Sequence, residues 1–197
     1  KYLDYNGLGS SNVHHNNKIF LGIGTPEQRS SKKKDCFYAS IVSLTDGKEL
    51  FKTKCLPKKY LDYNGLGSSN VHHNNKIFLG IGTPEQRSSK IRALAQDNNS
   101  MFGKILEINK IDLDKIVAKQ ESSLNVKIFT SGHRNPQGFT KINDSFFSVE
   151  HGPKGGDELN KIIKDKNYGW PAVSYGTQYA YDEDGKAYDI NHENNQF

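Results

Sequence analysis

The fold is decided by the stretch VKIFTSGHRNPQGFTKINDSFFSVEHGP at 126–153, in which two apolar runs alternate with two loops rich in glycine and proline. The first run is rich in β-branched and aromatic residues and stops at Gly132, and the second stops before Gly152 and Pro153. We expect Gly138 to permit a turn back into the second run. The pattern predicts strands that deliver their ends to polar loops, and therefore an all-β protein whose chemistry lies in those loops.

Oxygen donors gather where the second run ends. Pro153 has no N–H and cannot extend a ladder of strand hydrogen bonds, so main-chain carbonyls near it are left to bind something else. Asp157 and Glu158 add carboxylates within a few residues. Such hard oxygen ligands suit calcium better than zinc or copper. The alternative is an ordinary hairpin loop with solvated charges, because Gly, Pro and Asp are common in turns.

Three motifs follow one another in the last third of the chain: GHRNPQG at 132–138, EHGPKGGDELN at 150–160 and NYGWP at 167–171. In this order they resemble the glucose/sorbosone dehydrogenase family, as does AQDNNSMFGKILEIN at 95–109. The resemblance runs roughly from Cys36 to Phe197. It implies a quinoprotein that uses pyrroloquinoline quinone (PQQ) and calcium. It also implies a six-bladed β-propeller, of which this chain would hold a fragment of about two to three blades.

The quinone-binding residues implied by the resemblance lie in the first motif. Arg134 and Asn135 match the pair that contacts the PQQ quinone, and Arg134 would stabilise the negative charge that grows on the quinone oxygen. His133 and Gln137 match the motif without an assigned role, because a histidine in a turn is more often a satisfied loop residue than a ligand. Trp170 is interpreted as a packing anchor between blades, with a sugar platform as the alternative.

The resemblance also implies two calcium ions. The carbonyls of Gly152 and Pro153 match ligands of the calcium that bridges protein and cofactor. Glu158 and the Tyr168 carbonyl match ligands of a second, structural calcium. The bridging ion would act as a Lewis acid.

The implied reaction is oxidation of an aldose at its anomeric carbon, in which a histidine base takes the hydroxyl proton and hydride passes to the quinone. Counting back from the strand KIFLGIG at 76–82 places Asn64 at the family's base position, and asparagine cannot take a proton at neutral pH. His72 and His73, expected in the turn before that strand, are alternative bases. Loss of a general base lowers rates by about 10²–10⁴. We therefore expect impaired activity or, alternatively, a non-catalytic propeller that binds partners.

An unaltered repeat occupies 1–32 and 59–90. True structural repeats diverge and keep only their core pattern, so an identical copy indicates a recent duplication or an artefact. The second copy runs into IRALAQDNNS as in the family, whereas the first runs into KKDCFYAS, which by resemblance should precede it. We assign 33–197 to the partial propeller and interpret 1–32 as the misplaced copy, with two identical sites as the alternative. Such a copy must find a substitute edge, pair with another chain or stay mobile.

Composition agrees with an extracytoplasmic β protein. Hydrophobic residues make up 34% of the chain, and ten Tyr, ten Phe and eighteen Gly suit short strands and tight turns. No apolar run approaches the roughly 20 residues that span a bilayer, and the net charge of +5 has no interleaved aromatic stripe that would favour nucleic acid. The resemblance implies a periplasmic or secreted protein, acting on an aldose with an external electron acceptor. Open sheet edges favour oligomers.

A hairpin with Asp46 and Gly47 at its tip is predicted between CFYASIVSL and ELFKTKCLP. It would bring Cys36 and Cys55 nearly opposite each other, which predicts a cross-strand disulfide, with two buried free thiols as the alternative. The segment 111–120 is predicted to be a long connection between strands, and 181–191 a polar loop.

Overall fold

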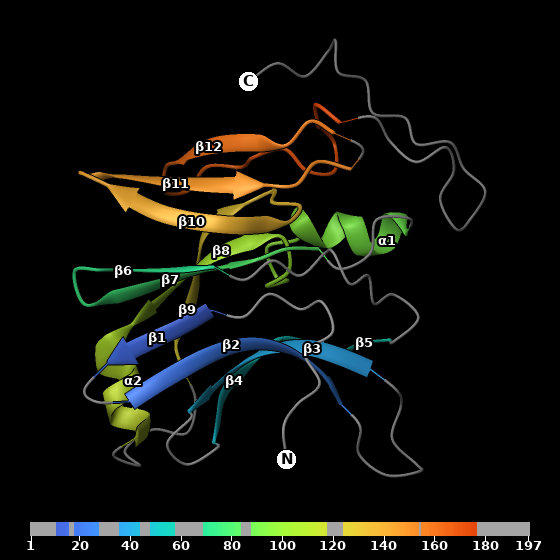
Figure 1. Ribbon diagram of the computed structural model, residues 1–197. Helices are drawn as coiled ribbons and strands as arrows, with labels where there is room; N and C mark the ends of the chain where they lie inside the picture. Colours follow the sequence, from blue (N-terminus) through green and yellow to red (C-terminus); the bar gives the residue numbers. More distant parts are fainter. Residues whose placement is uncertain are drawn as a thin grey trace.

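The computed structural model describes residues 11–15, 18–27, 36–43, 48–57, 69–83, 88–117, 124–153 and 155–176 (Figure 1). These residues form three antiparallel sheets that follow one another along the chain. The first sheet contains β1 (Ser11–His15), β2 (Lys18–Glu27), β3 (Cys36–Ser43), β4 (Glu49–Lys52) and β5 (Leu56–Pro57). The second contains β6 (Asn70–His73), β7 (Lys76–Ile81), β8 (Lys104–Asn109) and β9 (Val126–Ser131). The third contains β10 (Pro136–Ile142), β11 (Ser145–Glu150) and β12 (Glu158–Ile162).

Helices are few among the described residues, so the chain is mostly β-sheet. The all-β prediction is confirmed to that extent, and the fragment of a six-bladed propeller stays a prediction. The short helix α1 (Ser89–Arg92) continues into a 3-10 turn, η2 (Ala93–Ala95), between β7 and β8. Helix α2 (Lys110–Val117) follows β8 directly. The prediction of a plain connection over 111–120 was therefore wrong in part. The helix is stabilised by tertiary burial, because Leu113 is only 1% exposed and belongs to the main hydrophobic core.

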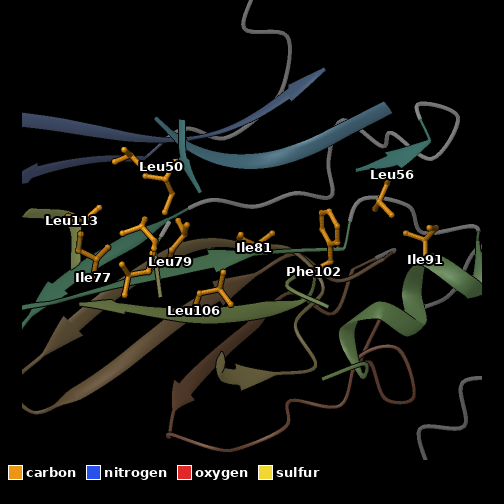
Figure 2. Close-up of a cluster of buried hydrophobic side chains, with 12 residues drawn as sticks. Leu50, Leu56, Ile77, Leu79, Ile81, Ile91, Phe102, Leu106 and Leu113 are labelled. Atoms are coloured by element: carbon orange, nitrogen blue, oxygen red, sulfur yellow. The ribbon is translucent and has the colours of Figure 1, made fainter. Parts of the chain in front are cut away.

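The three sheets are stacked, with the second in the middle (Figure 1). Successive side chains of a strand point to opposite faces, and both faces of β7 are covered. Ile77, Leu79 and Ile81 belong to the cluster between the second and first sheets, in which Leu50 lies near Leu79 and Leu56 lies near Ile91 and Phe102 (Figure 2). Phe78 points the other way. The uninterrupted apolar run KIFLGI is therefore the sequence of a strand buried on two sides.

The second cluster fills the space between the second and third sheets and is mainly aromatic. Phe78 packs edge-on against Phe129 of β9, with ring centroids 4.9 Å apart, and lies 4.8 Å from Phe146 of β11. Phe139 and Ile162 of the third sheet complete the cluster. This aromatic packing holds the second and third sheets face to face.

The duplicated sequence forms the same hairpin twice. Asn12 pairs with Leu21 in β1 and β2, and Asn70 pairs with Leu79 in β6 and β7, so the register is identical. The neighbours differ, because β2 pairs with β3 whereas β7 pairs with β8. The first copy thus takes the edge of β3, one of the three expected outcomes. Its assignment as the misplaced copy stays a prediction.

Two local predictions need correction. Gly138 makes no turn: β10 runs through it, and the register shifts between Pro136 and Gly138, so Gln137 is the extra residue of a β-bulge. His72 and His73 lie in β6 and not in the turn before β7. That turn is made by Asn74 and Asn75, with φ of 46° and 58°, which is the geometry of a tight two-residue hairpin loop.

The predicted pairing around the cysteines is confirmed. β3 runs antiparallel to β4 and β5, with Cys36 opposite Pro57. Cys55 is disulfide-bonded, and Cys36 is the other cysteine of the sequence. The hairpin tip at 46–47 and the loop at 181–191 lie outside the described residues. Within the described part of the chain, no helix is long and apolar enough to cross a membrane.

Candidate functional site

The ends of β7, β9 and β11 meet around the segment 132–135, which leads out of β9. Thr83, just beyond β7, donates its main-chain N–H to the Arg134 carbonyl at 2.8 Å. His151, just beyond β11, donates its N–H to the Asn135 carbonyl at 3.2 Å. The segment carrying Arg134 and Asn135 is therefore fixed on both sides by strands that are distant in sequence.

The Arg134 side chain, which belongs to the first predicted motif, contacts a residue in each of the other two. It is 6% exposed, and Nη1 donates a hydrogen bond of 2.5 Å to the carbonyl of His151, the residue before Gly152. Its guanidinium carbon lies 5.4 Å from the ring centroid of Trp170, within the range of a cation–π contact. The residues predicted to contact the quinone and the loop predicted to bind calcium are therefore adjacent.

Trp170 packs in the interior, as predicted, and is 3% exposed. Its indole Nε1 donates to the Thr83 hydroxyl at 3.0 Å, and its main-chain N–H donates to the Gly132 carbonyl at 3.0 Å. Gly132 itself adopts a left-handed conformation with φ of 76°. A Cβ there would lie 2.1 Å from Oδ1 of Asn167, so only glycine permits the close approach of these two motifs.

Asn135 is 1% exposed, and its amide is oriented by the neighbouring bulge. Gln137 donates from Nε2 to Oδ1 of Asn135 at 2.7 Å. Because the bulge makes Gln137 the unpaired residue of β10, its side chain is free to turn back toward Asn135. This gives Gln137 an orienting role that its place in the motif did not reveal.

The loop after β11 is held by its own carboxylate. Asp157 accepts the Gly152 N–H at 3.0 Å and contacts Nδ1 of His151 at 3.2 Å. The Gly152 hydrogen bond, with that of His151, holds the pKa of the Asp157 carboxyl below its ordinary value. A Cβ on Gly152 would lie 2.0 Å from the carbonyl oxygen of Gly155 and 2.6 Å from that of Gly156. Main-chain oxygens therefore crowd around Gly152.

His133 is completely buried and both ring nitrogens are engaged, which agrees with the interpretation of a satisfied residue. Nδ1 lies 2.6 Å from Oε1 of Glu150, and Nε2 lies 2.8 Å from the Thr130 hydroxyl. The ring stacks on Tyr168 with centroids 4.8 Å apart. Burial alone would raise the pKa of Glu150, but the charge and hydrogen bond of His133, with further hydrogen bonds from Asn160 and Ser148, lower it.

Glu158 and Tyr168, the predicted ligands of a second calcium, both lie beside this buried pair. Asn160 donates from Nδ2 to Glu158 at 3.0 Å and to Glu150 at 3.3 Å. Burial and, to a lesser extent, the charge of Glu150 raise the pKa of Glu158, against the opposing hydrogen bond from Asn160. In the described part of the chain, no three His, Cys, Asp or Glu side chains are grouped so that they could hold a metal ion. A calcium ion here would need main-chain oxygens.

A buried lysine, Lys104, holds the turn between α1 and β8 that contacts the site. Lys104 is fully buried, and its ammonium donates to the carbonyls of Leu94, Ala95 and Phe102 at 2.7–3.0 Å. Burial lowers the pKa of Lys104 to about 8, although the charge of Asp97 opposes this effect.

The turn that Lys104 holds contacts the first and third motifs. The Ala95 carbonyl accepts the N–H of Gly132 at 3.1 Å. The next residue, Gln96, donates from Nε2 to the Trp170 carbonyl at 2.5 Å and exchanges side-chain hydrogen bonds with Asn167.

The family model described as Glucose / Sorbosone dehydrogenase matches residues 10–196. The chain belongs to this family. Among curated proteins, the aldose sugar dehydrogenase of Escherichia coli is 36% identical over 109 residues, which are 53% of this chain and 28% of the relative. Quinoprotein glucose dehydrogenase B of Acinetobacter calcoaceticus is 42% identical over 107 residues, which are 51% of this chain and 22% of the relative. An uncharacterized protein of Synechocystis is 39% identical over 99 residues, 47% and 24% of the two chains.

Solved structures agree with this assignment. The soluble aldose sugar dehydrogenase of Escherichia coli in its apo-form superposes with a TM-score of 0.61 and 26% identity, covering 85% of this chain and 49% of that one. A glucose dehydrogenase superposes with a TM-score of 0.55 and 26% identity, covering 84% and 48%. The chain thus spans about half the length of these two solved structures, and the alignments cover about a quarter of the curated relatives.

The candidate general bases named from the sequence lie away from the described site or outside the described residues. Asn64 lies outside the described residues. His73 pairs with Lys76 at the start of β7, whereas Thr83 follows the end of the same strand. At about 3.3 Å per residue, this separation is roughly 20 Å. His72 and His73 therefore lie at the opposite end of the second sheet from Arg134, and neither can act as the base there.

Sequence reasoning missed several residues that hold this candidate site together. Glu150 falls within a quoted motif, but nothing local marks it as the partner of His133. Thr83 contacts the Arg134 carbonyl, and Lys104 contacts the Ala95 carbonyl. The folded chain brings both residues to the site, so their positions in the sequence do not reveal these contacts. The single sequence signal for Lys104 was its place in the family-like segment at 95–109.

Proposed function

We propose that the chain carries the cofactor-binding part of a PQQ- and calcium-dependent dehydrogenase that oxidises an aldose at its anomeric carbon. The observation that carries this proposal is the hydrogen bond of 2.5 Å from Arg134 to the His151 carbonyl, which joins the GHRNPQG and EHGPKGG motifs in one place. Membership of the family and the matched quinoprotein glucose dehydrogenase support the redox class.

The residues around Arg134 fit an anionic quinone. Its guanidinium is permanently charged, and at 6% exposure it lies in surroundings where a negative ligand is strongly favoured. Asn135 supplies an amide next to it, held by Gln137. We assign Arg134 and Asn135 to the binding of PQQ.

The donor set around Gly152 fits calcium. The proposal is supported by the abundance of main-chain oxygens in this loop, where the carbonyl oxygens of Gly155 and Gly156 lie close to Gly152. Calcium prefers such uncharged oxygens together with a few carboxylates. We assign the carbonyls of Gly152 and Pro153 to one calcium ion, and Glu158 with the Tyr168 carbonyl to a second. A cation beside Glu158 would offset the burial that raises the pKa of this carboxyl.

Three residues of the chain have defined tasks in this proposed reaction. When bound, PQQ supplies a quinone that accepts a hydride, and calcium supplies a Lewis acid. Arg134 would supply a fixed positive charge to a quinone that takes on negative charge, and the contacts with His151 and Trp170 keep the guanidinium from reorienting. Asn135 orients the ligand. Trp170, buried behind Arg134, excludes water from that side.

Proton removal is the step for which the base is not assigned among the described residues. Asn64 occupies the base position implied by the family resemblance, and an amide cannot accept the proton. A rate reduction of about 10²–10⁴ is expected. This one substitution favours a second candidate function, a propeller of the same family that binds partners without redox chemistry. For either function we propose a periplasmic or secreted protein; the enzyme would pass electrons to an external acceptor.

The test adds PQQ and calcium to the purified chain and records quinone absorbance and dye reduction with a panel of aldoses. The enzyme proposal predicts a shifted quinone spectrum, slow dye reduction, and faster dye reduction in Asn64→His. An unshifted spectrum with no sugar-dependent reduction in either protein would remove the enzyme proposal. A shifted spectrum without reduction in either protein would favour the binding module.

A further inference from the structure

His133 and Glu150 form a buried, hydrogen-bonded pair next to the residues proposed to bind the cofactor and the metal. Their side chains are 0% and 4% exposed, and the Nδ1–Oε1 distance is 2.6 Å, which is short for a hydrogen bond between a nitrogen and a carboxylate. His133 has no ring nitrogen left for a ligand, because Nε2 faces the Thr130 hydroxyl and the ring face is covered by Tyr168. The pair therefore cannot touch a substrate or cofactor directly.

The pair joins the two segments that carry the proposed ligands of the cofactor and the metal. His133 precedes Arg134, and Glu150 precedes His151. One residue farther along each segment, Arg134 donates to the His151 carbonyl and His151 donates to the Asn135 carbonyl. The buried pair and these outer hydrogen bonds are successive contacts between the same two segments, 133–135 and 150–151.

The carboxylate is itself fixed, so the pair forms a rigid spacer. Glu150 pairs with Pro136 on one side and with Glu158 on the other, in the middle strand of the third sheet. Its Oε1 also accepts from the Ser148 hydroxyl and the Asn160 amide, each at 3.3 Å. Because three donors hold the Glu150 carboxylate in place, the His133 ring that binds it has little freedom to move. Apolar side chains at these two positions would lack such directional contacts and would fix the distance between the two segments less strictly.

We propose that His133 and Glu150 are positioning residues whose hydrogen bond sets the spacing between Arg134–Asn135 and the Gly152–Pro153 loop, and so couples calcium binding to PQQ binding. This inference rests on the proposed function. It assigns the buried pair a role beyond filling space. Mutation of residues that hydrogen-bond to metal ligands, without touching the metal themselves, typically changes metal affinity or activity by about 10–100-fold.

The test measures the affinity of PQQ with saturating calcium and in excess EDTA, and takes the ratio of the two as the coupling. The variants are His133→Asn, which keeps a donor near the position of Nδ1, and Glu150→Gln, which keeps the shape and removes the charge. Leu106→Val is the control, because it loosens a fully buried core position of β8 without touching the site. Urea unfolding of every protein measures the accompanying loss of stability.

The inference predicts that Glu150→Gln lowers the coupling by about tenfold or more, that His133→Asn lowers it less, and that Leu106→Val leaves it unchanged at a similar stability. If both site variants lose stability but keep the coupling of the unmodified chain, the pair is only structural and the inference is overturned. If the unmodified chain binds no PQQ at all, the proposed function fails and the inference fails with it. The two failures are therefore distinguishable.

Discussion

Replacing Thr83 by valine should remove the hydrogen bond that fixes Trp170 behind Arg134. Valine has nearly the same shape as threonine, and the position is 1% exposed, so the change removes a hydroxyl without opening a cavity. The Trp170 indole has only a donor, and its acceptor at 3.0 Å is the Thr83 hydroxyl. A buried donor left unsatisfied costs about 1–3 kcal/mol. The Arg134 carbonyl keeps the Thr83 main-chain N–H at 2.8 Å, so no second group is orphaned.

The sequence contains a single tryptophan, so intrinsic fluorescence reports on this site directly. Urea unfolding followed by fluorescence should show Thr83→Val destabilised by about 1–3 kcal/mol. In a Trp170→Phe background, followed by circular dichroism, the same change should have little effect because no indole N–H remains. The difference between the two backgrounds is the coupling energy of the pair. If Thr83→Val costs the same in both backgrounds, within about 0.5 kcal/mol, the hydrogen bond does not hold Trp170 and the reasoning is refuted.

Three further changes follow from single features of the structure. Gly152→Ala should weaken PQQ binding in calcium by about tenfold or more, because its Cβ meets main-chain oxygens at 2.0 and 2.6 Å, whereas Gly138→Ala, whose Cβ would meet Val149 at 3.5 Å, should leave binding unchanged. Above pH 8 the folded chain releases the Lys104 proton while the unfolded chain keeps it up to about 10.5, so the unfolded state binds more protons. The stability of the unmodified chain should therefore rise with pH across this window relative to Lys104→Met, by at most roughly 3 kcal/mol, and parallel pH profiles would contradict this. Leu106→Ala, at a fully buried position, should cost about 2–5 kcal/mol in urea unfolding, whereas Leu159→Ala, at 72% exposure, should stay within about 0.5 kcal/mol; equal effects would contradict the placement of the core.

Much of the strand pattern could be predicted because it is local. The run before Gly132 and the run before Gly152 are both strands in the structure, and the first ends at a glycine in the left-handed conformation. The bulge at Gln137 could not be predicted, because the glycine that follows permits a turn or a bulge equally well and the partner strand decides between them. Helix α2 was missed for a related reason: its weak apolar pattern is completed by the burial of Leu113 against other elements.

The site was predictable as far as its motifs reach. Arg134 and the Gly152 loop are adjacent, as their motifs indicate. The residues that hold them in place come from elsewhere in the chain. Thr83 contacts Arg134 across 51 positions of sequence, and a pairing of this kind leaves no periodic signal. Lys104 falls in a strand-like segment, and lysine is almost never fully buried, so its role depends on a fold that brings three carbonyls to one point.

Calorimetric titration of PQQ into the unmodified chain, once with saturating calcium and once with excess EDTA, tests the central claim that two strand-end loops form one site for a quinone and a metal ion. The account predicts one PQQ per chain, bound about tenfold or more tightly when calcium is present. No binding, or the same affinity with and without calcium, would contradict it.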